Sequence, residues 1–133
     1  MNTTYFLNLT AGQLFKTKTD VPIPSKYFIG LSATEPNADG TNFTEPSVDA
    51  GYSRMPLESL STPSTGVVTN TQNVNFPEST GDWGTITHFV IFDAAENGNL
   101  LMYGELSRSR EVEAGTVMTI REGALKLSAQ NPA

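Results

Sequence analysis

The chain has 133 residues, no cysteine and a formal net charge of −6. That length fits one domain with a core of its own, and the absence of cysteine excludes disulfides and thiolate metal sites. The eight lysines and arginines are scattered, so no basic face for nucleic acid is visible. No apolar run approaches the ~20 residues that cross a bilayer, so we expect no membrane insertion.

The N-terminal segment, residues 3–16, predicts a short amphipathic helix. Phe6, Leu7, Leu14 and Phe15 recur at roughly helical spacing, and Thr3 or Thr4 is a suitable N-cap. Gly12 weakens the helix and leaves a strand as the alternative. Two prolines then break either periodicity, so residues 17–25 are interpreted as a linker.

Short apolar stretches separated by turns follow the linker. Residues 26–32 predict a buried strand, 33–51 a long exposed loop, and 52–57 a strand with Pro56 at an edge or end. Residues 67–76 alternate with period two, but Asn and Thr occupy both faces. We interpret this segment as one strand that is partly solvated or covered by a neighbouring subunit.

The segment from Trp83 to Asp93 becomes apolar on both faces, which predicts a central strand with Ile86, His88, Val90 and Phe92 on one face. Asn97-Gly98 marks a hairpin. The further strands predicted are 100–106, 110–112, 117–121 and 124–128. Together these elements predict an all-β fold: a single antiparallel, jelly-roll-like β-sandwich over 26–128 with a short N-terminal helix, in one domain spanning 1–133.

His88 is the only histidine, so a Ser-His-Asp site would need it, with Ser79, Asp82 and Asp93 nearby in sequence. However, it lies in the middle of a strand whose pattern demands packing, and the chain has no Gly-x-Ser-x-Gly elbow. The pattern favours a core or interface histidine and a protein that is not an enzyme. Trp83 is similarly expected to plug the core; the alternative is that it stacks on a sugar ring.

The remaining polar clusters have little specificity. Asp39, Glu45 and Asp49 share the long loop, but the ligand spacing of a calcium loop is missing, so no metal is expected. Glu105 and Glu111 could be nominated as the two carboxylates of a glycoside hydrolase, but any other acidic pair of the chain could be nominated equally well. The run from Ser107 to Arg110 could hold an anion, although a solvated turn is favoured. No phosphate-binding glycine loop is present, and no cofactor is expected.

The order of motifs resembles a family of small virion structural proteins of tailed bacteriophages and prophages, often described as tail-fibre-like. The resemblance rests on five segments that span most of the chain: TEPNADG (34–40), GYSR (51–54), NFPESTGDWGTITH (75–88), FDAAENGNLLMYGEL (92–106) and EAGTVMTIREGALKLS (113–128). It implies a non-enzymatic particle component at the tail, baseplate, fibre or head surface. It supplies no catalytic residues.

We therefore expect a virion protein, assembled in the bacterial host cytoplasm, whose partners are other virion proteins and copies of itself, with no nucleic acid or membrane partner. The residues expected to form the assembly surface are Phe6, Leu7, Leu14, Phe15, Asn70 and Gln72. The residues expected to form the core signature are Trp83, His88, Phe92 and Asp93. The alternatives are a carbohydrate-binding module that stacks sugars on Trp83 with Tyr52 or Tyr103, and a small hydrolase that uses His88.

Overall fold

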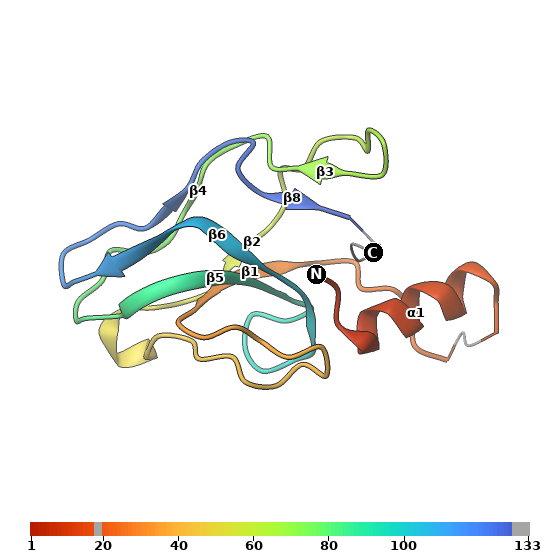
Figure 1. Cartoon of the computed structure of the whole chain (residues 1–133), viewed down its shortest axis with the longest axis horizontal. Helices are drawn as coiled ribbons and strands as arrows, with labels where there is room; N and C mark the ends of the chain where they lie inside the picture. The colour runs from red at the N-terminus through yellow and green to blue at the C-terminus, as the bar shows by residue number, and fades with distance from the viewer. Residues whose placement is uncertain (18–19, 129–133) are drawn as a thin grey trace.

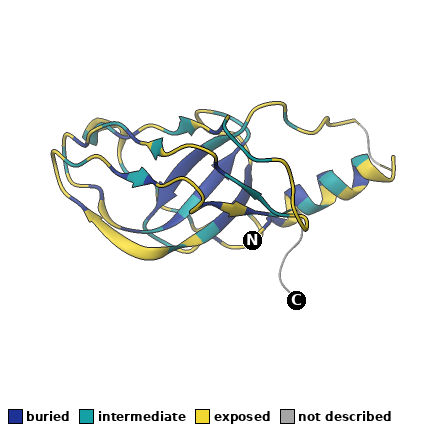
Figure 2. Cartoon of the chain, turned by 90° about the horizontal axis from the view of Figure 1, so that it is seen from above, coloured by how far each residue is buried: buried dark blue, intermediate teal, exposed yellow. Residues whose placement is uncertain are grey.

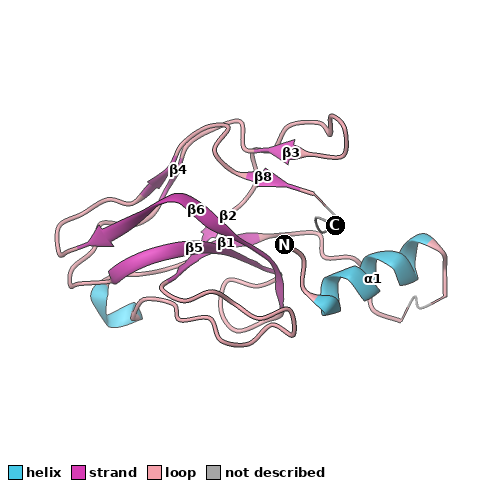
Figure 3. Ribbon diagram, in the orientation of Figure 1, coloured by secondary structure: helices cyan, strands magenta, loops and turns pink. Residues whose placement is uncertain are grey.

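The computed structural model of the chain describes residues 1–17 and 20–128. It is mostly β-structure with one short α-helix, as the sequence predicts (Figures 1 and 3). The elements in chain order are α1 (Thr4–Leu14), β1 (Phe28–Ser32), the 3-10 turn η1 (Val48–Ala50), β2 (Met55–Pro56), β3 (Val68–Thr69), β4 (Val74–Asn75), β5 (Gly84–Phe92), β6 (Leu100–Val112), β7 (Thr119–Ile120) and β8 (Lys126–Leu127).

The strands form one larger sheet and two short ladders. The larger sheet is antiparallel with the order β2-β1-β5-β6, while β3 pairs with β8 and β4 pairs with β7. The two ladders lie over one face of the larger sheet (Figure 1). The predicted second sheet of a β-sandwich is therefore replaced by two separate ladders, because the segments above the sheet are too short and too bent to form one continuous layer.

The order of strands confirms two predictions. β5 is central, with β1 on one side and β6 on the other, and β2 is an edge strand that holds Pro56. The β5–β6 hairpin also follows the sequence, because Asn97 and Gly98 both have positive φ angles, 56° and 74°. A Cβ at Gly98 would lie 2.5 Å from Asp93 Oδ1, so this turn needs glycine.

The faces of β5 differ from the prediction. The register between β5 and β6 is irregular between Ile86 and His88. This irregularity places Ile86 with Ile91 in the main core, whereas Val90 and Phe92 lie in a smaller cluster. The strict alternation that would place Ile86, His88, Val90 and Phe92 on one face is thus wrong, because the pairing is irregular where extra residues of β6 lie opposite Ile86 to His88.

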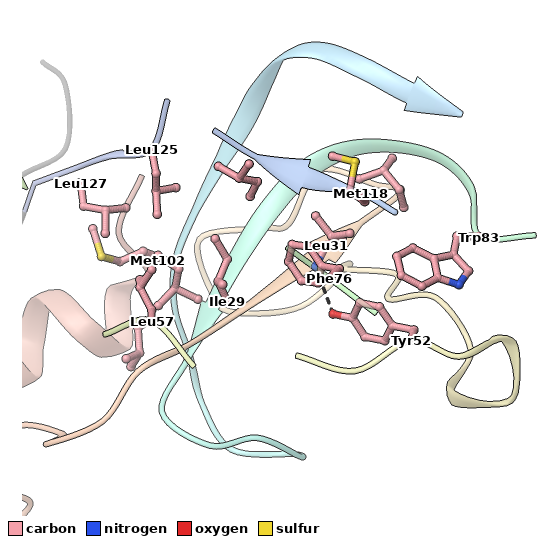
Figure 4. Packing of buried hydrophobic residues seen from close by; sticks show 14 of the residues in the cluster. Ile29, Leu31, Tyr52, Leu57, Phe76, Trp83, Met102, Met118, Leu125 and Leu127 are labelled. Carbon is pink, nitrogen blue, oxygen red and sulfur yellow. Dashed lines mark hydrogen bonds between the residues drawn. The ribbon is translucent and has the colours of Figure 1, made fainter. Parts of the chain in front are cut away.

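The main core lies between the sheet and the two ladders (Figure 4). Ile29, Leu31 and Ile91 contribute from the sheet, and Ile120 and Leu127 from the ladders. The smaller cluster joins Val90 and Phe92 to Leu100 and Tyr103, with Phe43 of the 33–51 loop against it. A loop rather than a sheet therefore covers this second cluster.

The N-terminus is tied to the outer edge of β6 before the helix begins. Thr3 N donates to Leu101 O at 2.9 Å and Tyr103 N donates to Met1 O at 2.8 Å. Thr3 is the N-cap of α1, as predicted, and its Oγ1 also donates to Leu100 O at 2.8 Å. The helix is therefore anchored at its start and extends away from the sheet (Figure 1).

The segment 67–76 is not the single strand that its alternation predicts. It forms β3 and β4, with a bend between them at Asn70–Asn73. Asn70 is buried and clamps the C-terminal segment: its Nδ2 donates to Gln72 O and Arg121 O, and its Oδ1 accepts from Leu125 N. At Asn70, hydrogen bonds within the chain explain the polar residue that had suggested a neighbouring subunit.

We predict that Asn70→Ala destabilises the fold by about 1–3 kcal/mol, because it leaves the buried Leu125 N–H without its partner and removes one of the two hydrogen bonds to the Arg121 carbonyl. Gln72→Ala is the matched control, since Gln72 is exposed, and it should change the free energy of unfolding by less than about 0.5 kcal/mol. Chemical denaturation of both variants measures the difference. Equal effects would contradict the clamp.

Candidate functional site

Trp83 and His88 lie in the interior. Trp83 is 5% exposed, and its indole Nε1 donates to Ala50 O at 2.9 Å. The His88 ring is also buried, with Nδ1 within 2.8 Å of Thr87 Oγ1. Trp83 therefore joins the end of the 33–51 loop to the core, as the sequence predicts for a core plug.

The polar residues near His88 in sequence do not gather around it. Asp93 accepts from Asn99 N at 2.7 Å and closes the β5–β6 turn. Ser79 bonds to the carbonyls of Glu113 and Thr116, and Asp82 accepts from Ala114 N. Each of the three stabilises a turn, so the arrangement provides no proton relay through His88.

An ion pair between Glu45 and Arg54 covers the second face of the sheet. Arg54 Nη2 lies 2.7 Å from Glu45 Oε1, and Nε donates to Glu45 Oε2 at 3.0 Å. The pair is bidentate and largely buried, with exposed side-chain fractions of 7% for Arg54 and 17% for Glu45. The remaining Arg54 group, Nη1, donates to the carbonyls of Ala94 and Asn97.

Tyr52 links this ion pair to the edge of β1. Its hydroxyl accepts from Leu31 N at 3.0 Å, beyond the end of β2 (Figure 4). The same hydroxyl donates to Glu45 Oε2 at 2.5 Å. Burial above all raises the pKa of Tyr52, and the hydrogen bond and charge of Glu45 raise it further. The hydroxyl thus stays protonated and takes the place of a backbone partner for β1.

Aromatic packing completes the same network. The Arg54 guanidinium lies over the Phe92 ring, 3.4 Å from its centroid, and Phe43 packs edge-on against that ring at 5.3 Å. A hollow of about 740 Å³ lies beside the network, with Phe43, Glu45 and Arg54 among its lining residues. Every nitrogen of the guanidinium already donates within the chain, so this hollow does not present Arg54 as a site for an anion.

The carboxylates of the long loop do not form a metal site. No group of three or more His, Asp or Glu side chains within residues 1–17 and 20–128 is placed to hold an ion. Asp39 instead accepts from Thr41 N at 3.0 Å and from Thr41 Oγ1, and these hydrogen bonds hold its pKa below the usual value. Asp39 therefore closes a turn.

The residues expected to form the assembly surface divide into two groups. Phe6 is buried in the core and Asn70 is buried beneath the C-terminal segment, so neither is available on the isolated chain. Leu7 is half-buried and Gln72 is exposed. Leu14 and Phe15, at the end of α1, are 70% and 71% exposed. One side of the helix is exposed along its length, and its most exposed large apolar side chains are at the C-terminal tip (Figure 2).

An apolar groove of about 430 Å³ begins at the base of the same helix. Its walls include Phe6 of α1, Leu57 next to β2, Val68 of β3, Met102 of β6 and Leu127 of β8. An exposed apolar tip and an apolar groove on one small protein are features of contact surfaces, because water leaves both favourably when they are covered.

Sequence reasoning missed the Glu45–Arg54 network. Glu45 looked like one of several loop carboxylates, and Arg54 appeared only within the GYSR motif. A signal was present in the spacing, because Tyr52 and Arg54 are two residues apart and so lie on the same side of an extended chain. The partner carboxylate could not be chosen, since Asp39, Glu45 and Asp49 are equivalent in sequence.

We predict that Arg54→Lys destabilises the fold by about 2–4 kcal/mol, because an ammonium cannot pair with Glu45 through two nitrogens and also reach Ala94 O and Asn97 O. Arg108→Lys, at an exposed position, is the control and should be close to neutral. Thermal and urea unfolding measure both. If Arg54→Lys were also neutral, the network would not be structural.

Comparison with known proteins agrees with this picture of a scaffold. No helix among the described residues has the length and apolar character to span a bilayer. A search of curated proteins found no match to the chain. A family model, described as podophage GP4 fiber I protein gp80, matches residues 2–128 and thus nearly the whole sequence. The chain therefore belongs to the family of the podophage fiber I protein gp80.

Proposed function

We propose that this protein is a non-enzymatic structural component of a phage tail fibre, and that it works by making contacts with copies of itself and with neighbouring virion proteins. The observation that carries the proposal is the exposed apolar tip of α1 on a chain that belongs to a fibre protein family. The proposal places the protein in the virion, with assembly in the cytoplasm of the host bacterium and without a nucleic acid or membrane partner.

The shape of α1 supports a contact role. Phe6 and Leu9, in its first half, are buried against the core, whereas Leu14 and Phe15 extend beyond it. Val21 and Ile23 of the following linker are also exposed, at 39% and 46%. Four large apolar side chains of this part of the chain are thus exposed, and protein partners cover exposed apolar surface of this kind.

The apolar groove supports copies of the same chain as one partner. Leu14 lies about two helical turns beyond Phe6, and Phe6 forms one wall of the groove. A helix is too stiff to fold its own tip back into a groove at its base, so the tip can fill only the groove of another molecule. Two copies with antiparallel helices would satisfy both grooves at once, as a two-fold interface requires.

The carbohydrate-binding alternative loses its proposed sugar platform. Trp83, Tyr52 and Tyr103 are the rings that were expected to stack on sugars, and they are 5%, 4% and 7% exposed. A stacking platform must present a ring face to solvent. These three rings pack in the two core clusters instead.

We predict that a double variant, Leu14→Gln with Phe15→Gln, lowers self-association and incorporation into particles while leaving the fold intact, because both side chains are exposed. Light scattering after size exclusion measures the oligomer, and blotting of purified particles measures incorporation. Substitution is preferable to deletion of the N-terminus, since Met1 and Thr3 bond to β6 and Phe6 is part of the core.

Val48→Gln with Val117→Gln is the matched control, because these valines are 77% and 52% exposed and lie away from α1. The control should associate and incorporate like the parent. The proposed role of the tip is wrong if the Leu14 and Phe15 variant associates and incorporates normally, or if both double variants lose these properties equally.

A further inference from the structure

Three arginines gather at a hollow on the side of the molecule where β6 approaches β7. Arg108 and Arg110 belong to β6, Arg121 follows β7, and all three line a hollow of about 140 Å³. Among the described residues, none of the three side chains forms an ion pair with a carboxylate or a hydrogen bond. Arg54, by contrast, is fully paired within the chain.

The charges at this hollow are unbalanced. Glu105 is the acidic residue that lines it, so three guanidinium groups share one carboxylate. No salt bridge joins Glu105 to any of the described arginines. Glu111 and Glu122 follow Arg110 and Arg121 in the chain but do not line the hollow, so the hollow itself carries an excess of positive charge that attracts an anion.

The chain holds the arginines in place through its backbone. The carbonyl of Arg121 accepts from Asn70 Nδ2 at 2.9 Å and from Ala124 N at 3.0 Å, which fixes the turn that carries this side chain. On β6, the residues from Glu105 to Arg110 oppose only His88 to Ile86 of β5. This irregular stretch of β6 carries Arg108 and directs its side chain to the hollow.

The apolar lining of the hollow and the neighbouring edge of β6 indicate which kind of anionic ligand fits. Phe89, Met118, Ile120 and Leu125 line the hollow with apolar surface beneath the arginines. β6 is also an edge strand, and the N-terminal residues cover its outer side only as far as Tyr103. Apolar surface, cations and an open strand edge together match an extended peptide that alternates acidic and apolar side chains.

We propose that this hollow and the adjoining β6 edge form a docking site for an acidic, extended segment of another virion protein. Its carboxylates pair with Arg108, Arg110 and Arg121, and an apolar side chain between them covers Phe89. The site goes beyond the assembly role of α1 and does not depend on it, because α1 and the far end of β6 lie at opposite ends of the molecule (Figure 1).

Charge disfavours a second copy at this edge in the registers that are centred on the arginines or between them. In a two-fold antiparallel pairing centred on Ser109, Arg108 of one copy faces Arg110 of the other. A pairing centred on either arginine places that residue opposite itself. Like charges directly opposite one another are destabilising, so self-pairing is disfavoured in these registers, whereas an acidic strand from a different chain meets no such repulsion.

The test measures binding of a fluorescein-labelled peptide of alternating glutamate and valine to the full chain by fluorescence anisotropy. We expect the triple variant Arg108→Gln, Arg110→Gln, Arg121→Gln to bind at least about tenfold more weakly than the parent. Glu105→Gln should bind more tightly than the parent, because it removes the negative charge that lines the hollow. This gain cannot result from unfolding.

The matched control is the triple variant Lys16→Gln, Lys26→Gln, Lys126→Gln. It also removes three positive charges, but from residues that do not line the hollow, and it should bind the peptide within about twofold of the parent. Raising the ionic strength from about 0.05 M to about 0.5 M should weaken binding, and a glutamine-valine peptide should not bind. Thermal unfolding verifies that each variant folds.

The proposal is overturned if the parent fails to bind the acidic peptide at low ionic strength, or if the lysine control loses as much affinity as the arginine variant. It is also overturned if inorganic tripolyphosphate displaces the acidic peptide from the parent protein and binds the parent with higher affinity than the peptide does. The site would then select phosphate. Normal particle incorporation of the Leu14 and Phe15 variant would leave this result unaffected, so the two proposals fail separately.

Discussion

The buried ion pair between Glu45 and Arg54 is the constraint on which the covered second face of the sheet depends. It holds the 33–51 loop against β1 and β5, because Arg54 reaches Glu45, the β5–β6 turn and the Phe92 ring at once. Gly30 makes the approach possible, since a Cβ there would meet the Tyr52 hydroxyl and the Arg54 side chain. A loop that is held by a desolvated ion pair thus covers the second face of the sheet in place of another sheet. Removal of one partner would leave the other charge buried and unpaired, which would strongly destabilise the fold.

Because the polar groups of the Glu45–Arg54 network are paired with one another, the chemistry that this network could offer a partner is already used within the chain. The tip of α1 and the C-terminal end of β6, the strand that carries Arg108 and Arg110, lie at opposite ends of the molecule (Figure 1). One surface is apolar and the other is cationic, so they suit different partners. The two proposed contact surfaces would therefore let one molecule link unlike neighbours in a fibre.

The parts of the fold that depend on local patterns were predictable from the sequence. Thr3 caps α1, Asn97-Gly98 forms the hairpin, and the apolar stretch after Trp83 is the central strand. The sequence-based predictions were wrong where contacts between distant parts of the chain determine the local structure. The bend at Asn70 depends on Arg121 and Leu125, which are distant in sequence, and the bulge after Ile86 depends on extra residues in β6. For the contact surfaces, apolar spacing identified α1 but could not show that Phe6 is buried and Phe15 exposed, because both satisfy the same helical period.

The central claim is that this chain is a fibre component whose α1 tip is covered by another protein chain. Cryo-electron microscopy of a phage particle that carries this protein tests the claim most directly. The account predicts that density for the chain lies in a tail fibre and that Leu14 and Phe15 are buried against a neighbouring molecule. Particles in which every copy leaves these two side chains in solvent would contradict it.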